Sequence, residues 1–231
     1  MSNNLAAIPF QIFYEPGKAF AALREKSHTW LPLLALMVGS AAMMYWYFQT
    51  VDFPWMMEQT AAANPDMTEE QREAMKSMMS VSAMTWTTLG GILIGTPLIY
   101  AVYALYFLLA GKFLGSEISY GKWFALTVWT SLPRLLVLPL MALQIMTSGG
   151  RVAMEDLSMV SLNFLLFQLP VGHPWAGLLA NLDLPLLWSA ALTVIGLRVW
   201  TGRSLATCIT IAVLPLALIF GVWAAKIALF A

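Results

Sequence analysis

Charge is what this sequence has least of. Only 10% of its 231 residues are Asp, Glu, Lys or Arg, whereas 60% are hydrophobic. An average soluble domain carries about a quarter charged residues, which cover its surface. The twelve basic and twelve acidic residues also balance, so no excess of positive charge indicates a nucleic-acid partner. These deficits exclude an ordinary soluble domain and favour a protein whose solvent is lipid.

Cysteine and histidine are also scarce. Cys208 is the only cysteine, so no disulfide can form within one chain. The two histidines, His28 and His173, fall on opposite sides of the membrane in the topology derived below. The sequence contains no HExxH zinc pair, no nucleophile elbow and no phosphate-binding glycine loop. We therefore expect no enzyme, no metal and no cofactor.

Five apolar stretches are long enough to cross a membrane, because a hydrocarbon core of about 30 Å requires roughly 20 helical residues. These stretches are residues 30–49, 86–110, 123–146, 178–197 and 205–230. The sequence therefore predicts an all-α fold, a polytopic membrane helical bundle with five transmembrane helices. Residues 1–29 are expected to form a cytoplasmic segment, and residues 30–231 the membrane domain.

The distribution of lysine and arginine predicts the orientation. One set of alternate segments outside the spans contains Lys18, Arg24, Lys26, Lys112, Lys122, Arg198 and Arg203. The other set contains Arg72, Lys76 and Arg151, and Lys226 near the outer end of the fifth span is counted with it. Because basic residues accumulate on the cytoplasmic side, we expect a cytoplasmic N-terminus and a C-terminus outside.

The segment before the first span combines aromatic and basic side chains over residues 9–26. Its notable residues are Phe10, Phe13, Tyr14, Pro16, Lys18, Phe20, Arg24 and Lys26. A proline suits the first turn of a helix, and apolar and basic residues at helical spacing are typical of helices in the membrane interface. The sequence predicts an N-terminal amphipathic interfacial helix on the inner leaflet.

The segments outside the membrane show further patterns. Thr68 followed by Gln71 resembles a capping box, which would open a helix that continues into the second span. The apolar residues 157–169 are too few to span, so we expect an interfacial or re-entrant helix. The methionines of the first outer loop could hold monovalent copper, but without neighbouring Cys or His we favour an adaptable apolar face.

A polar cluster is predicted in the third and fourth spans. It consists of Thr127, Thr130, Ser131, Arg134, Asn181 and Asp183. Arg134 lies near mid-membrane, where a charge costs several kcal/mol unless it is paired or hydrated, and Asp183 is its natural partner. The hydroxyl residues precede Arg134 by three, four and seven positions, so they share its helical face. The cluster is interpreted as a structural ion pair, as a substrate or lipid-headgroup site, or as unpaired lipid-facing positions.

Two glycines, Gly91 and Gly95, are four residues apart in the second span. This spacing lets another helix approach closely, either within the chain or in a dimer. Pro97 follows them and indicates a tolerated kink.

Several short motifs carry a resemblance to a known family. They are Phe13-Tyr14-Glu15-Pro16 before Trp30-Leu31-Pro32, the segment 115–120 leading through Lys122 to Leu132-Pro133, Leu182-Asp183-Leu184 before Trp188, and Gly196-Leu197. Over nearly the whole chain, this arrangement resembles the bacterial members of the Yip (Ypt/Rab-interacting protein) domain family of five-span membrane proteins. The resemblance implies a compact helical bundle in the bacterial cytoplasmic (inner) membrane.

Eukaryotic relatives, as the resemblance implies, contact Rab-type GTPases in vesicle traffic through two short elements. Tyr14 and Pro16 fit the first element, whereas Ile12 and Glu15 stand where that element has Asp and Gly. Pro133 fits the second element, whereas Val128 and Trp129 replace its Gly and Tyr.

These patterns favour a Yip-like, non-enzymatic membrane protein that acts by lateral interaction with membrane lipids, with another membrane protein or with a second copy of itself. The alternative is a small transporter or lipid-translocating protein with a polar site around Arg134 and Asp183. A five-span chain without an evident inverted repeat is small for alternating access unless it forms oligomers.

Overall fold

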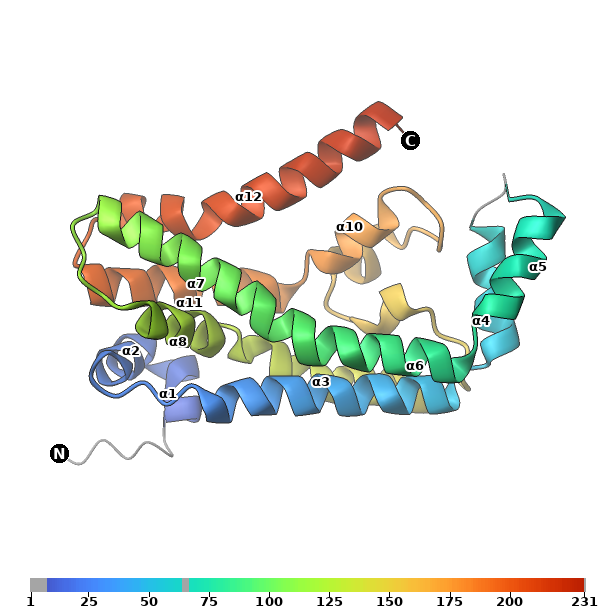
Figure 1. Ribbon diagram of the computed structural model, residues 1–231, viewed down its shortest axis with the longest axis horizontal. Coiled ribbons are helices and arrows are strands. Elements are labelled where there is room, and N and C mark those ends of the chain that lie inside the picture. The colour runs from blue at the N-terminus through green and yellow to red at the C-terminus, as the bar shows by residue number, and fades with distance from the viewer. Residues whose placement is uncertain (1–7, 64–66, 231) are drawn as a thin grey trace. The chain divides into compact units, whose positions relative to one another are not determined.

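The computed structural model describes residues 8–63 and 67–230, and its elements are helical throughout this part of the chain (Figure 1). The helices before the second span are α1 (Ile8–Tyr14), α2 (Pro16–Glu25), α3 (Trp30–Thr50), α4 (Phe53–Ala62) and α5 (Glu69–Met78). The second and third spans contain α6 (Val81–Gly90), η2 (Gly91–Gly95), α7 (Thr96–Phe113), α8 (Tyr120–Thr130), η3 (Leu132–Val137) and α9 (Leu138–Thr147). The remaining elements are η4 (Met154–Leu157), η5 (Asn163–Phe167), α10 (Ala176–Asn181), α11 (Leu184–Thr201) and α12 (Leu205–Phe230).

Five helical stretches of the described residues are long and apolar enough to cross a membrane. They are Trp30–Thr50, Val81–Phe113, Tyr120–Thr147, Leu184–Thr201 and Leu205–Phe230. The predicted all-α, polytopic membrane class is therefore confirmed. The fourth span begins later than the predicted residue 178, because Leu182 is extended and separates α10 from α11.

The start of the second span differs from its prediction in one respect. The Thr68–Gln71 capping box is present and opens α5. However, α5 ends at Met78, Met79 is extended, and the Ser80 hydroxyl caps α6 by accepting a hydrogen bond from the Ala83 N–H at 3.1 Å. The prediction of one helix that continues from Thr68 into the membrane is wrong, because Ser80 provides a second helix start.

Two spans contain non-α turns next to prolines. The π-helical turn η2 lies immediately before α7, in which Pro97 stands within the first two positions. A proline lacks an N–H and its ring clashes with the carbonyl four residues earlier, and a wider turn relieves both problems. In the third span, η3 is a 3-10 helix that contains Pro133 and Arg134. Arg134 therefore does not continue the α-helical face of the residues before it.

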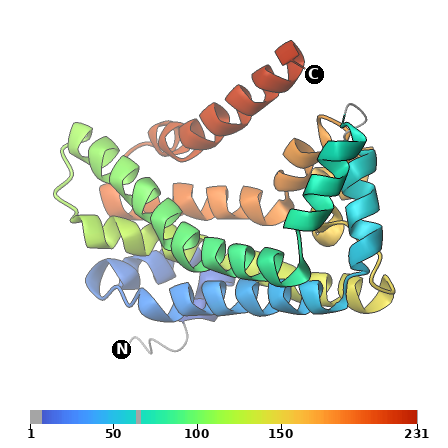
Figure 2. The ribbon, with the colours of Figure 1, turned by 45° about the vertical axis from the view of Figure 1, so that its right-hand side comes forward.

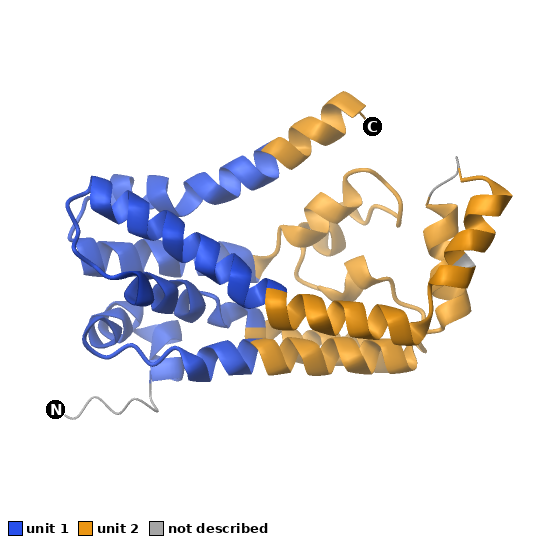
Figure 3. Cartoon of the chain, viewed as in Figure 1, with its two compact units in different colours: residues 1–36, 95–134, 185–221 blue, residues 37–94, 135–184, 222–231 orange. Residues whose placement is uncertain are grey.

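The chain divides into two compact units (Figure 3). Unit 1 comprises the described residues up to Leu36, Gly95–Arg134 and Pro185–Gly221. Unit 2 comprises Met37–Ile94, Leu135–Leu184 and the described residues from Val222 onward. The borders fall inside α3, η2, η3, α11 and α12, so each unit draws on every span.

In unit 1, the N-terminal helices pack against membrane-spanning helices. Phe20 and Leu23 of α2 are fully buried, and α2 contacts α8, which in turn packs along α7 (Figure 2). The indole N–H of Trp200 donates to the Phe20 carbonyl oxygen at 2.7 Å. The indole N–H of Trp129 donates to the His28 carbonyl oxygen at 3.2 Å. Side chains of α8 and α11 thus hold the backbone of the N-terminal segment.

The N-terminal segment differs from the single interfacial helix expected from the sequence. It forms two helices that are separated at Glu15, with Pro16 starting α2. Phe20 faces the protein interior, and Phe13 makes an edge contact with Trp188 at 5.3 Å between ring centroids. Among the aromatic residues of the two helices, Phe10 and Tyr14 are exposed.

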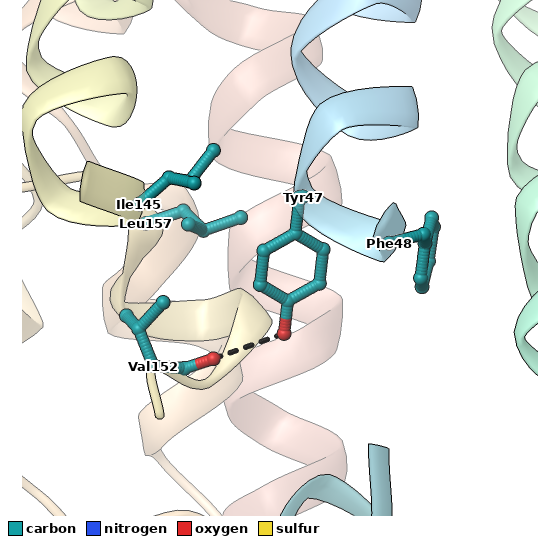
Figure 4. Close-up of a cluster of buried hydrophobic side chains, with 5 residues drawn as sticks. All are labelled: Tyr47, Phe48, Ile145, Val152 and Leu157. Carbon is teal, nitrogen blue, oxygen red and sulfur yellow. Dashed lines mark hydrogen bonds between the residues drawn. The ribbon is translucent and has the colours of Figure 1, made fainter. Parts of the chain in front are cut away.

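Unit 2 has its own apolar core (Figure 4). Its buried members are Tyr47, Phe48, Ile145, Val152 and Leu157. The Tyr47 hydroxyl donates to the Val152 carbonyl oxygen at 2.9 Å, so this buried polar group is satisfied. The core therefore ties the end of α3 to the segment after α9.

Candidate functional site: a basic cavity in unit 1

The structure first shows where the predicted polar cluster lies. Thr127, Thr130 and Ser131 are buried on α8 and just after it. The Thr127 hydroxyl donates to the Trp123 carbonyl oxygen at 3.1 Å. The hydroxyls of Thr130 and Ser131 both donate to the Thr127 carbonyl oxygen, at 3.1 and 2.9 Å. These hydroxyls are therefore satisfied within their own helix and require no ligand.

The charged members of the cluster belong to different units. Arg134 is exposed and is the last residue of its unit 1 segment. Asp183 is half-buried in unit 2, where its backbone forms an isolated antiparallel bridge with Ser161. The Asn181 side chain donates to the Gly177 carbonyl oxygen at 2.8 Å. The Arg134–Asp183 pair stays a prediction.

The two glycines of the second span lie on an open surface. A Cβ atom added to Gly91 or Gly95 would meet no atom of the described chain within 4 Å. No close helix contact therefore uses these glycines within that part of the chain. Contact with a second chain stays a prediction.

A cavity of about 760 Å³ in unit 1 brings together residues that are far apart in the sequence. Its lining comprises Arg24, residues 114–119, Lys122 and residues 200–203. Three of these residues, Arg24, Lys122 and Arg203, are cationic, and Glu117 is the one acidic residue of the lining. We call this site the basic cavity.

Two glycines that terminate helices fix the course of the loops around the basic cavity. After α7, Gly115 has a φ of +71°, and its N–H donates to the Lys112 carbonyl oxygen at 2.9 Å. The Ser116 N–H donates to the Gly111 carbonyl oxygen at 2.9 Å. This pair of bonds is a Schellman motif, which requires a left-handed residue and thus favours glycine. Gly202, with a φ of +66°, ends α11 and directly precedes Arg203.

Two of the cations contact the C-terminal ends of helices. The Arg203 guanidinium donates to the Leu114 carbonyl oxygen at the end of α7. The Lys122 ammonium donates to the Arg24 carbonyl oxygen in the last turn of α2. Because the C-terminus of a helix carries partial negative charge, both contacts stabilise the helix ends. Each bond uses one donor of a side chain that has three or five.

The cations of the basic cavity have no carboxylate partners in the described parts of the chain. The ion pairs found there, within 4.0 Å, are Lys18–Glu15, Arg72–Glu69 and Arg151–Asp52. The Arg24 side chain is exposed and donates no hydrogen bond to the described part of the chain. The cavity therefore presents positive charge that the surrounding protein leaves without a paired anion.

Comparison with known proteins places the chain in a family. The family model described as the Yip1 domain matches residues 10–225. The chain belongs to the Yip1 domain family. No curated protein and no solved structure matches it. The matched region of the Yip1 domain extends from α1 into α12, so it includes all residues of the basic cavity.

The sequence predicted an interfacial helix that contains Arg24, and it placed Arg24, Lys122 and Arg203 of this Yip1 domain on one side of the membrane, but their convergence on one cavity was not predicted. One signal was available. Gly115 and Gly202 each follow a predicted span on the same side of the membrane, and Lys122 and Arg203 follow them by seven positions and by one. Glycines that end helices mark the loops in which these basic residues lie. The sequence alone does not give the distance between the two loops, because that distance depends on the fold.

Unit 2 of the Yip1 domain contains a second cavity of about 490 Å³. Its lining includes Trp55, Gln144, Arg151 and Asp156. Burial raises the pKa of the Asp156 carboxyl, and the neighbouring charge of Glu155 adds to this shift. Among the described residues, no group of three or more His, Cys, Asp and Glu could hold a metal ion.

Proposed function

We propose that this Yip1-domain protein is a non-enzymatic protein of the bacterial cytoplasmic membrane that acts by lateral contact with lipids or with another membrane protein. Its N-terminus is cytoplasmic and its C-terminus is outside. The observation that carries the proposal is the basic cavity. Every segment that lines it, from Arg24 through 114–119 to 200–203, belongs to the side that the positive-inside rule assigns to the cytoplasm.

The chemistry of the basic cavity supports binding over catalysis. Its lining contains no His and no Cys, so a hydroxyl such as that of Ser116 or Ser119 has no imidazole beside it to act as a base. Glu117, its one carboxylate, is exposed. A cavity with cations, hydroxyls and backbone groups is suited to hold an anionic group.

A transport function is the second candidate, and one observation favours it. The 3-10 segment η3 interrupts the third span at Arg134, and interrupted helices line the substrate sites of many transporters. In this alternative, the region of Arg134 and Asp183 forms the polar site for a transported anion or a lipid headgroup.

Crosslinking in membranes tests the proposed function. A photoreactive amino acid at Ile118, in the lining of the basic cavity, should form adducts with lipids or with a membrane protein. The same group at exposed Leu229, near the end of α12, is the control for nonspecific contact. Absence of any adduct specific to Ile118 would contradict the proposal.

Cysteine labelling tests the orientation. In a Cys208→Ala background, single cysteines replace Ser116 in the loop after α7 and exposed Ser77 in α5. An impermeant reagent added outside should modify the cysteine at position 77 and leave the one at position 116 unmodified. The reverse pattern would overturn the orientation.

A further inference from the structure

We propose that the basic cavity is a binding site for a phosphate group, presented by the headgroup of an anionic glycerophospholipid in the cytoplasmic leaflet. The inference rests on the proposed function and names the ligand of its site. It is carried by the convergence of Arg24, Lys122 and Arg203 on one cavity without carboxylate partners.

Charge makes an anion the suitable ligand. Three cations and one carboxylate line the cavity, so the site carries an excess of positive charge. Like charges in one cavity repel one another, and a bound anion offsets that repulsion. Guanidinium groups bind phosphate through two parallel hydrogen bonds, and ammonium groups bind it as point charges. Arg24 retains all its donors, and Lys122 and Arg203 retain those not used at the helix ends.

The size of the cavity suits a headgroup. Its volume of about 760 Å³ lies within the range of small-molecule sites, about 300–1,000 Å³. Neutral donors are also available, because Ser116 and Ser119 line the cavity, and the Ser119 hydroxyl makes no capping bond to α8. A glycerophosphate group can therefore contact cations and hydroxyls in one site.

The surroundings of the cavity indicate a lipid source for the phosphate. The helix ends beside its loops expose apolar and aromatic side chains: Phe113 is 93% exposed, Tyr120 41% and Leu205 49%. Such residues at span ends are typical of the membrane interface, which is also the level of lipid phosphates. A lipid phosphate could enter the cavity while its acyl chains remain in the membrane beside these residues.

Arg24 offers the cleanest test. Its side chain makes no hydrogen bond to the described chain, so Arg24→Gln should remove a ligand contact without removing a structural bond. Lys26→Gln is a matched control, because Lys26 is exposed, lies two residues away and does not line the cavity. Both changes remove one positive charge from the same segment. Arg24→Lys retains the charge but loses the bidentate geometry.

Native mass spectrometry of the full chain and its variants, purified in detergent, measures how much of each lipid is retained. The probes are phosphatidylglycerol, phosphatidylcholine and, as the soluble arm, glycerol phosphate and inorganic phosphate. We expect preferential retention of phosphatidylglycerol, a loss of about tenfold in Arg24→Gln because a charge-assisted hydrogen bond is removed, and an intermediate loss in Arg24→Lys. Lys26→Gln should bind like the unchanged protein, and all variants should melt at similar temperatures.

Several results would overturn the inference. An equal loss in Lys26→Gln would show general surface attraction in place of a site. Binding of soluble phosphates without retention of phosphatidylglycerol would contradict the lipid source. If phosphatidylglycerol is not retained but Ile118 crosslinks to a membrane protein, the inference fails while the proposed function stands. If neither retention nor crosslinking occurs, both fail.

Discussion

The indole N–H of Trp200 donates a hydrogen bond to the backbone carbonyl of Phe20, 2.7 Å away, and both side chains are almost completely buried. This bond joins α11 to α2 across most of the sequence. Arg24 lies four residues after Phe20, about one helical turn, and lines the basic cavity. The position of Arg24 therefore depends on the attachment of α2 to the bundle.

The first prediction concerns this attachment. Trp200→Phe removes the indole donor of this buried hydrogen bond, which should cost about 0.5–1.5 kcal/mol in unfolding free energy, because the Phe20 carbonyl keeps its bond within α2. Thermal melting in detergent measures the loss. Trp188→Phe is the control, because Trp188 contacts Phe13 through its ring alone and is 40% exposed. Equal losses in the two variants would contradict the account.

The second prediction compares two adjacent glycines. Gly150 has a φ of +82°, and a Cβ atom there would lie 2.6 Å from the Thr50 carbonyl oxygen. Gly149 has a φ of +61° and open space around its Cα. Gly149→Ala should lower the free energy of unfolding by about 1–2 kcal/mol, because alanine disfavours the left-handed backbone conformation. Gly150→Ala should lower the free energy of unfolding by about 1–3 kcal/mol more, because the new methyl group would overlap backbone atoms, which cannot move as a flexible side chain can. Equal melting temperatures for the two variants would show that space at Gly150 is not limiting.

The third prediction concerns two aspartates of unit 2 with opposite pKa shifts. The Trp55 N–H and then the Arg151 guanidinium hold the pKa of Asp52 below its ordinary value, about 3.9. The stability that ionised Asp52 contributes is present above that value and is lost as the pH falls through the lowered pKa. Burial raises the pKa of Asp156, so its protonated form favours folding, and this contribution is lost as the pH rises through the raised pKa.

Thermal melting at neutral and at mildly acidic pH checks the direction of both pKa shifts. Asp52→Asn should lower the melting temperature at neutral pH, because the ion pair with Arg151 is lost. Asp156→Asn should raise the melting temperature at neutral pH, and its advantage should shrink as the pH falls. A rise in Asp52→Asn or a fall in Asp156→Asn would reverse the assigned signs.

The fourth prediction concerns Arg134 and Asp183. A structural pair predicts that Arg134→Ala destabilises the bundle and that adding Asp183→Asn recovers part of the loss. We expect a coupling above about 1 kcal/mol in the double-mutant cycle. A transport or headgroup site predicts instead that Arg134→Ala stays folded and loses any anion-dependent stabilisation. Coupling near zero would mean that the two residues do not interact.

The five spans could be predicted because the length of an apolar run relates directly to the thickness of the membrane. The helix start at Thr68 could be predicted because a capping box is a local pattern. The break at Ser80 was missed because a helix that continues and a helix that restarts share the same composition. The 3-10 segment around Arg134 was missed because Pro133 permits several backbone solutions.

The basic cavity could not be predicted in the same way. Positions 24, 122 and 203 come together only through tertiary packing of α2, α8 and the loop after α11. The periodicity of residues 9–26 indicated an apolar face, but periodicity does not distinguish a face covered by lipid from one covered by protein. The Phe20 side chain is covered by protein, because α8 and α11 pack against it.

The most direct test of the central claim is an experimental structure of the full chain in a bilayer that contains phosphatidylglycerol. The account predicts a lipid phosphate in the basic cavity, with its oxygens within hydrogen-bond distance of the Arg24 guanidinium and of Lys122 or Arg203. A structure in which Arg24 pairs with Glu117 and ordered lipid phosphates lie only outside the cavity would contradict it.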